Sequence, residues 1–167
     1  VFGTTSNALV AFDVATGGVN WRYHVAGARF GAMPVDAEGT VYFGSSVGWG
    51  GASGGGDADM SVYAINSDGS LKWSTYITNE MMQGMLLSDD ESKLYFKAFN
   101  GDGKLMCMDT ATGSVLFKVT KGGGDAFPDI ARDADDNLYG GGFNGMAKWD
   151  SDGNQLWVNT TYTDPYV

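Results

Sequence analysis

The sequence contains one cysteine, Cys107, and one histidine, His24, among its 167 residues. A single cysteine excludes an intrachain disulfide and a zinc site built from several cysteines. His24 has no evident partner in the sequence, so a Ser-His-Asp arrangement is not indicated and a structural role is favoured for it. We therefore expect no catalytic residue, no bound metal and no cofactor, and predict that the protein is not an enzyme.

Basic residues are also scarce, with 10 Lys and Arg against 20 Asp and Glu, and the net charge is −10. This charge repels phosphate backbones and anionic lipids, so we expect neither a nucleic-acid partner nor a membrane-surface role. No run of about 18 apolar residues exists, so membrane insertion is not expected. The sequon Asn159-Thr160-Thr161 is compatible with a secretory route, which favours an extracellular, periplasmic or organelle-lumen location.

Glycine, with 26 residues, and aromatic residues, at 13%, are abundant, as is typical of short strands joined by tight turns. A turn followed by a bulky aromatic recurs four times, with a glycine four residues before each aromatic. These aromatic anchors are Trp21, Trp73, Phe117 and Trp157, spaced 52, 44 and 40 residues apart. Three further apolar stretches precede the turn in each complete repeat. The period predicts an all-β fold, a β-propeller of four blade-equivalents of four-stranded antiparallel sheets.

Residues 11–21, AFDVATGGVNW, carry the pattern Ala-x-Asp-x-x-Thr-Gly-x-x-x-Trp. Residues 107–117 repeat it with Cys for Ala and Phe for Trp, while 64–73 and 148–157 are shorter by one residue, the latter with Lys148 in place of Ala. This pattern resembles the docking motif of the PQQ-like (quinoprotein) propeller repeat, a family that includes enzymes and non-catalytic scaffolds. We expect each anchor to pack between neighbouring blades, with an indole N–H donating to a carbonyl.

The blade units are expected at about 1–25, 30–77, 83–119 and 126–159 of a single domain or fragment spanning 1–167. The first unit begins at its second strand, and residues 163–167 start a next or a closing strand. A closing strand would give a four-bladed ring, whereas a next strand would make these units part of a larger propeller. We favour the larger propeller, because the PQQ-like propellers that the repeat resembles usually have more than four blades.

The first and third turns of such a blade lie at one end, and they are short and acidic here. Asp133-x-Asp135-x-Asn137 resembles the start of an EF-hand loop but lacks its later Gly and Glu, so no tight calcium site is expected. The variable segments, including an insertion at 45–60, lie at the opposite end, where we expect any partner to bind. The candidate binding residues there are Arg29, Trp49, Asn79, Glu80, Met82, Lys121 and Asp125.

Packing motifs beside so few catalytic groups favour a non-catalytic, PQQ-like propeller that serves as a protein-binding or structural scaffold in a larger assembly. Its partner would be another protein or other blades of the same parent chain. One alternative is a fragment of a PQQ-dependent quinoprotein oxidoreductase. The resemblance implies a vicinal cysteine pair, a calcium site and a catalytic Asp for such an enzyme, and Cys107 has no cysteine neighbour. A carbohydrate-binding or adhesive propeller, suggested by Trp49, is a third possibility.

Overall fold

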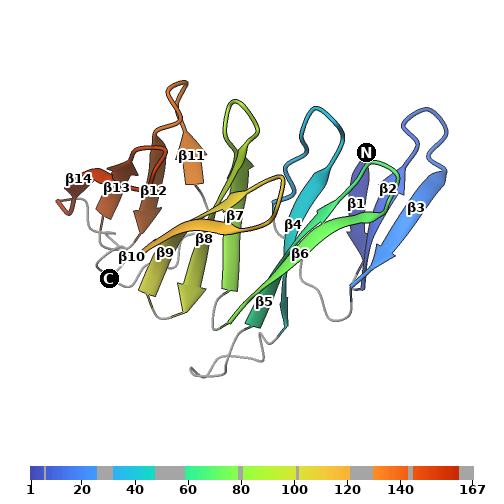
Figure 1. The fold of residues 1–167 in the computed structure, drawn as a ribbon, viewed down its shortest axis with the longest axis horizontal. Coiled ribbons are helices and arrows are strands. Elements are labelled where there is room, and N and C mark those ends of the chain that lie inside the picture. Colours follow the sequence, from blue (N-terminus) through green and yellow to red (C-terminus); the bar gives the residue numbers. More distant parts are fainter. Residues whose placement is uncertain are drawn as a thin grey trace. The chain divides into compact units, whose positions relative to one another are not determined.

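The computed structural model describes residues 1–5, 7–25, 32–47, 59–78, 81–100, 102–120, 130–142 and 145–161. Within these ranges the chain forms fourteen β-strands and no helix, so none is available to cross a membrane (Figure 1). Every strand pairs antiparallel with its sequence neighbour in one of four sheets, which we call blades 1 to 4. The expected all-β fold is confirmed. The chain divides into two compact units, Val1–Glu80 and Met81–Val167.

The first unit contains blades 1 and 2, each a three-stranded sheet. Blade 1 consists of β1 (Phe2–Thr5), β2 (Ala8–Phe12) and β3 (Val19–His24), and blade 2 of β4 (Val41–Val47), β5 (Asp59–Ile65) and β6 (Leu71–Ile77). Within the described residues, blade 2 has no strand before β4, where a fourth strand was expected. Only an isolated bridge joins Val35 to Val41, and Tyr42 donates its backbone N–H to Pro34 O. Pro34 has no N–H to return to the ladder, which shortens the pairing there.

The second unit contains blades 3 and 4, which both have the four strands expected. Blade 3 consists of β7 (Met81–Leu87), β8 (Lys93–Asn100), β9 (Asp102–Asp109) and β10 (Val115–Thr120). Blade 4 consists of β11 (Ile130–Arg132), β12 (Leu138–Gly142), β13 (Gly145–Trp149) and β14 (Gln155–Asn159). The innermost strands β7 and β11 lie against each other.

Each outer strand contains a one-residue bulge next to its anchor. In blade 1, Phe12 pairs with Val19 and Ala11 pairs with Trp21, which leaves Asn20 without a cross-strand partner. The same shift occurs in blades 2, 3 and 4. Because side chains alternate along a strand, the extra residue transfers the anchor to the opposite face of the sheet. The sequence pattern did not predict this bulge, which decides the direction in which each anchor points.

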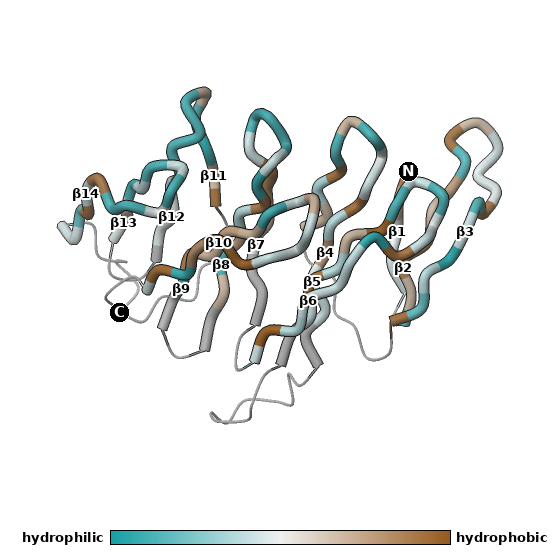
Figure 2. Tube along the Cα trace, in the orientation of Figure 1, coloured by the Kyte–Doolittle hydropathy of each residue, from teal (hydrophilic) through white to brown (hydrophobic). Residues whose placement is uncertain are grey.

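The core of each unit lies between its two sheets. In the first unit, Leu9 packs with Val41, Phe43 and Ile65, all fully buried. In the second, Tyr95 and Cys107 of blade 3 pack with Leu138 and Ala147 of blade 4. The turns that join β7 to β8 and β11 to β12 are hydrophilic, whereas apolar residues gather along the strands (Figure 2). Burial of these apolar faces is the main stabilising term of each unit.

Candidate functional site

Most of the candidate binding residues fall outside the part of the chain that the structure describes. They are Arg29, Trp49, Asn79, Glu80, Lys121 and Asp125. Met82 lies in β7, and its side chain is outside the description. The described polar residues gather instead at the end of the blades that carries the short acidic turns. There they form the contacts of one blade with the next.

Blades 1 and 2 are joined through Trp21 of β3. Its indole Nε1–H donates to Ser67 O at 2.9 Å, in the turn between β5 and β6. Its ring covers Gly69 of the same turn so closely that an added Cβ would lie 2.8 Å from Trp21 Cγ. Gly69 has φ +89°, a conformation that favours glycine. The turn glycine therefore serves two purposes, a left-handed backbone and a flat surface for the ring.

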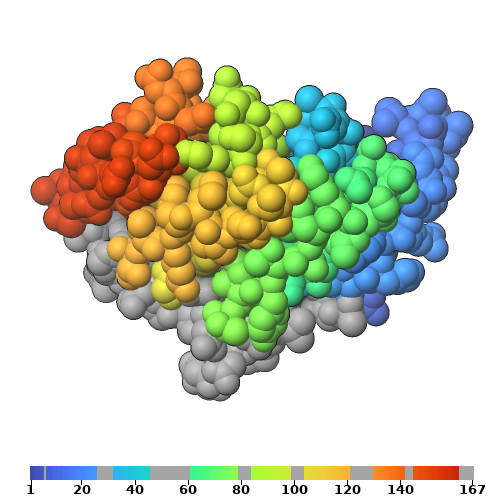
Figure 3. Space-filling model, viewed as in Figure 1, coloured from blue at the N-terminus to red at the C-terminus, as the bar shows by residue number. Residues whose placement is uncertain are grey.

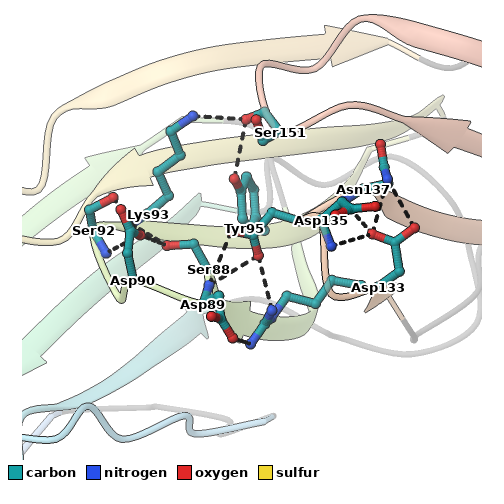
Figure 4. Close-up of polar contacts among 12 residues, drawn as sticks. Ser88, Asp89, Asp90, Ser92, Lys93, Tyr95, Asp133, Asp135, Asn137 and Ser151 are labelled. Atoms are coloured by element: carbon teal, nitrogen blue, oxygen red, sulfur yellow. Dashed lines mark hydrogen bonds and ion pairs between the residues drawn. The ribbon is translucent and has the colours of Figure 1, made fainter.

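Blades 3 and 4 meet through the corresponding pair, Phe117 and Gly153. A Cβ on Gly153 would lie 2.8 Å from the Phe117 ring. The Phe117 side chain has no N–H group that could replace the Trp21 indole. Other donors reach the turn carbonyl that corresponds to Ser67 O. Ser151 O accepts from Lys93 Nζ at 3.1 Å and from the Tyr95 hydroxyl at 3.2 Å (Figure 4). Blade 3 thus satisfies this carbonyl from β8 rather than from its outer strand.

Lys93 also contacts the carboxylate of the same turn, with Nζ 2.9 Å from Asp152 Oδ1. This hydrogen bond raises the pKa of the Lys93 ammonium. Burial raises the pKa of the Tyr95 hydroxyl, which stays protonated and can donate. Sequence reasoning missed both residues. The signal available was the substitution of Phe for Trp at position 117, which removes a donor that the turn of blade 4 requires.

A second contact between blades 3 and 4 is formed by Arg132 at the end of β11. Its guanidinium lies 3.2 Å from Asp89 Oδ1 of the β7–β8 turn and 3.0 Å from Asp136 Oδ1. Asp136 in turn accepts the backbone N–H of Asp89 at 3.0 Å. The three residues link the first turns of the two blades. Both acids belong to the short acidic turns that the sequence predicts at this end, and Arg132 joins them across the two blades.

The EF-hand-like stretch in blade 4 is a closed turn. Asp133 accepts from the backbone N–H and side-chain amide of Asn137, and from the Tyr139 hydroxyl at 2.8 Å. Lys148 Nζ lies 3.5 Å from the same carboxylate. Burial opposes ionisation of Asp133, but these hydrogen bonds outweigh it and lower the pKa. Its carboxylate oxygens accept hydrogen bonds from donors of the same turn and from Tyr139. No group of three metal-ligating side chains occurs within the described residues.

The repeated aspartates of the third turns have the same local role. Asp13 Oδ1 accepts from the backbone N–H groups of Ala15 and Thr16 and from the Thr16 hydroxyl at 2.8 Å. The Thr16 hydrogen bonds lower the pKa of Asp13. Asp109 contacts Thr112 in the same way. These carboxylates hold turns, which accounts for the recurrence of Asp at this position.

The chain has one thiol, Cys107, and one imidazole, His24, and their environments differ. Cys107 is fully buried in β9, and burial raises the pKa of its thiol to about 12. A thiol in this state is not a nucleophile near neutral pH. His24 is exposed at the end of β3. The charge of Lys93 lowers the pKa of Cys107, but burial outweighs it.

The repeated sheets, their bulged outer strands and the ring-over-glycine contacts define a β-propeller of the PQQ-like class. The sequence matches the PQQ-like family described as outer membrane protein assembly factor BamB over residues 1–164, and the chain belongs to that family. None of the curated protein sequences matches it.

Solved structures resemble the fold at low identity. A Bacteroides caccae protein of unknown function aligns at TM-score 0.66 and 15% identity, over 96% of this chain and 57% of that one. The designed protein Ika8 aligns at TM-score 0.66 and 15% identity, over 93% of this chain and 46% of its own. A gluconolactonase from Xanthomonas campestris aligns at TM-score 0.57 and 20% identity, over 95% and 57%. The chain spans about half the length of these structures, and the likeness concerns the fold alone.

Proposed function

We propose that this chain is a non-catalytic propeller module that binds a protein partner or supports a larger assembly. The observation that carries the proposal is the use of its ionisable side chains. Lys93, Arg132 and Asp133 are each engaged in a turn or a blade-to-blade contact. Cys107 is buried, with its pKa raised to about 12. Groups committed to packing in this way are unavailable to activate a substrate, whereas a rigid scaffold presents loops to a partner.

The partner surface is assigned to the end of the blades opposite the acidic turns. Thr110 of the β9–β10 turn donates to Glu91 O of the β7–β8 turn, and Lys93 reaches the β13–β14 turn, so these turns share one end of the second unit. Antiparallel connection of the strands predicts that the variable segments, which lie outside the described residues, are at the other end. The family is described as an outer membrane protein assembly factor. On this basis we propose a protein partner and a location in the periplasm or another compartment outside the cytoplasm.

Site-specific photo-cross-linking tests this surface in source cells. A photoreactive amino acid is introduced at Trp49, Asn79 or Lys121 for the variable end, and at Asp68, Asp90 or Asp152 for the acidic end. We expect one protein, identified by mass spectrometry, to be captured from the variable end and lost when Arg29 and Lys121 are replaced by Ala. Capture of that protein from the acidic end alone, or from neither end, would contradict the proposal.

The quinoprotein alternative is tested by reduction of 2,6-dichlorophenolindophenol in the presence of PQQ and calcium. We expect no turnover above that of the same reaction without the protein. Robust turnover would overturn the non-catalytic assignment. A glycan array tests the carbohydrate alternative, and specific binding that is lost in Trp49→Ala would favour it.

A further inference from the structure

Three tyrosines of the first unit lie where blade 1 meets blade 2, and we call them the tyrosine cluster. They are Tyr23 of β3, Tyr63 of β5 and Tyr76 of β6. The ring centroids of Tyr23 and Tyr63 are 6.2 Å apart. Tyr63 pairs with Ser74, two residues before Tyr76, so Tyr63 and Tyr76 are diagonal neighbours on one face of the sheet. Side chains of both blades therefore contribute to the cluster.

The cluster is open to solvent along the outer strand of blade 2. Tyr76 is 60% exposed, whereas Tyr23 and Tyr63 are half-buried. Figure 3 shows β6 at the surface, coloured green. Tyr23 and Tyr76 lie near the ends of their strands that are farther from the acidic turns. The exposed ring of Tyr76 is thus accessible to a ligand on the side of the blades assigned to the partner.

The fold does not require aromatic rings at these positions. The second unit also packs two blades, and its residues at the same distances from the anchors are smaller. Counted in this way, the counterparts of Tyr23, Tyr63 and Tyr76 are Val119, Ala147 and Thr160. Val119 and Ala147 pack in the core of the second unit. Packing between blades is therefore possible without the three rings, which are a specific feature of the first unit.

The hydroxyl groups of Tyr23 and Tyr63 can act as donors to a ligand. Neither forms a hydrogen bond within the described ranges of the chain. Burial raises the pKa of Tyr23, and the nearby Tyr63 raises it further, so the Tyr23 hydroxyl is protonated near neutral pH. Polar groups removed from water are normally hydrogen-bonded. Two half-buried hydroxyls of this kind favour a ligand that supplies acceptors.

The surroundings of the cluster are uncharged, although the chain has a net charge of −10. Three rows of cross-strand neighbours contain the tyrosines. They are Thr4–Leu9–Tyr23, Phe43–Tyr63–Ser74 and Ser45–Ser61–Tyr76. None of these residues carries a charge, so an ionic ligand finds no counter-charge in the three rows. The surface suits a neutral ligand that combines apolar groups with hydrogen-bond acceptors.

We propose that the tyrosine cluster binds a proline-rich, extended segment of the protein partner. A polyproline II segment has no internal hydrogen bonds and its prolines have no N–H, so it presents apolar rings and carbonyl acceptors. Aromatic side chains are the usual platform for such segments. A saccharide would need acceptors for its own hydroxyl groups, and the three rows contain no carboxylate or side-chain amide. The inference rests on the proposed protein-binding function and names the chemistry of the partner.

Fluorescence anisotropy of a fluorescein-labelled decaproline peptide with the purified 167-residue protein tests the proposal. We expect saturable binding, and none for a glycine–serine peptide of the same length. Tyr76→Ala is expected to raise the dissociation constant by roughly 30-fold, the effect of removing a central interface aromatic. Leu116→Ala is the matched control and should leave binding unchanged, because Leu116 is 50% exposed on the outer strand β10 and lies outside the cluster.

Tyr23→Phe and Tyr63→Phe keep the rings and remove only the hydroxyl groups. We expect each variant to weaken decaproline binding by about fivefold, as for one lost hydrogen bond, with an unchanged midpoint of urea unfolding. Cellohexaose is titrated against the same variants as a neutral saccharide. The proposal is overturned if decaproline does not bind, if Tyr76→Ala leaves its binding unchanged, or if only cellohexaose binds in a manner that depends on Tyr76.

The photo-cross-linking experiment separates this inference from the proposed function. Capture of a partner from the variable end that is lost in Tyr76→Ala supports both. Capture that Tyr76→Ala leaves unchanged overturns the inference, while the protein-binding function stands. Decaproline binding without any captured partner supports a proline-rich ligand at the cluster and overturns the function proposed for the variable end.

Discussion

The indole N–H of Trp21 donates to the backbone carbonyl of Ser67 at 2.9 Å, which joins blade 1 to the third turn of blade 2. Trp21→Phe keeps a ring over Gly69 and removes only this donor, so we expect a loss of about 1 kcal/mol in the free energy of unfolding. Trp21→Ala removes the ring as well and should cost about 2–4 kcal/mol, because the side chain is half-buried. Urea unfolding measures both. Equal losses would show that the ring contributes nothing beyond its hydrogen bond.

The turn glycines offer a comparison of backbone strain with packing. Gly69→Ala and Gly17→Ala both place a side chain at positive φ, which costs about 1 kcal/mol. Only Gly69→Ala also forces a Cβ to 2.8 Å from Trp21, so we expect a further loss of about 1–3 kcal/mol for that variant. Thermal and urea unfolding of the two variants check this difference. A similar loss at both sites would mean that the ring over Gly69 yields easily.

The contribution of Lys93 is expected to come from the carbonyl of Ser151 rather than from the ion pair. Asp152 has a side chain that is 74% exposed, and exposed ion pairs contribute little. We predict that Lys93→Met lowers the free energy of unfolding by about 1–2 kcal/mol, while Asp152→Ala lowers it by less than about 0.5 kcal/mol. A double-mutant cycle between the two positions should give a small coupling energy. A coupling as large as the whole Lys93→Met loss would contradict this assignment.

The first turns of blades 3 and 4 contain two non-glycine residues at positive φ, Glu91 at 59° and Asp136 at 57°. Gly39 has the corresponding place in blade 2, at 84°. Glu91→Gly relieves this conformation, and we expect the free energy of unfolding to rise by about 0.5–1 kcal/mol. Asp136→Gly relieves the same strain but removes one of the two carboxylate partners of Arg132 and the acceptor of the Asp89 N–H, so we expect a net loss of about 1 kcal/mol. Stabilisation by both variants would mean that the arginine contact contributes nothing measurable.

The lowered pKa of Asp90 leads us to expect a specific dependence of the free energy of unfolding on pH. Hydrogen bonds from Ser88 and Ser92 lower its pKa from 3.8 to about 2. The folded state binds this proton less readily than the unfolded state, so Asp90 stabilises the fold above about pH 4, and the contribution is lost as pH falls toward about 2. We expect the stability of wild type relative to Asp90→Asn to decrease over this window in urea titrations. A constant difference between pH 6 and pH 2 would show that the pKa is not lowered.

Much of the fold could be predicted from the sequence because its signals are local. The Asp, Thr and Gly of residues 13–17 encode a turn through hydrogen bonds within a few residues, and the same chemistry recurs at 109–113. Alternation of apolar residues sets the strands. The strands of a blade are connected antiparallel in sequence order, so the first and third turns must lie at the same end. The sequence therefore predicts that the acidic turns share one end of the blade. Within the described residues, the main difference is that an isolated bridge at Val35 stands where a strand before β4 was expected, and Pro34 has no N–H to donate there.

The candidate site could not be predicted in the same way. The sequence pointed to residues on the variable segments, whereas the described polar contacts involve Lys93, Tyr95 and Arg132. These contacts depend on which carbonyl or carboxylate of the following blade comes within about 3 Å, the range of a hydrogen bond. The spacing of residues within one repeat does not predict the donor–acceptor distance between two blades. Only the substitution of Phe at position 117 indicated that a donor had to come from elsewhere.

The sequence by itself determined the repeat, the strands and the turns, because these depend on neighbours a few residues away. The tertiary structure decided how deeply the anchor of each repeat is buried. Trp73 and Trp157 follow the same turn pattern, yet the first is buried and the second is exposed. The bulges set the face of the sheet on which each anchor lies, and the turns of blades 2 and 4 cover Trp21 and Phe117. Burial depends on the surface that an anchor meets, so similar motifs give anchors of different exposure within the described residues.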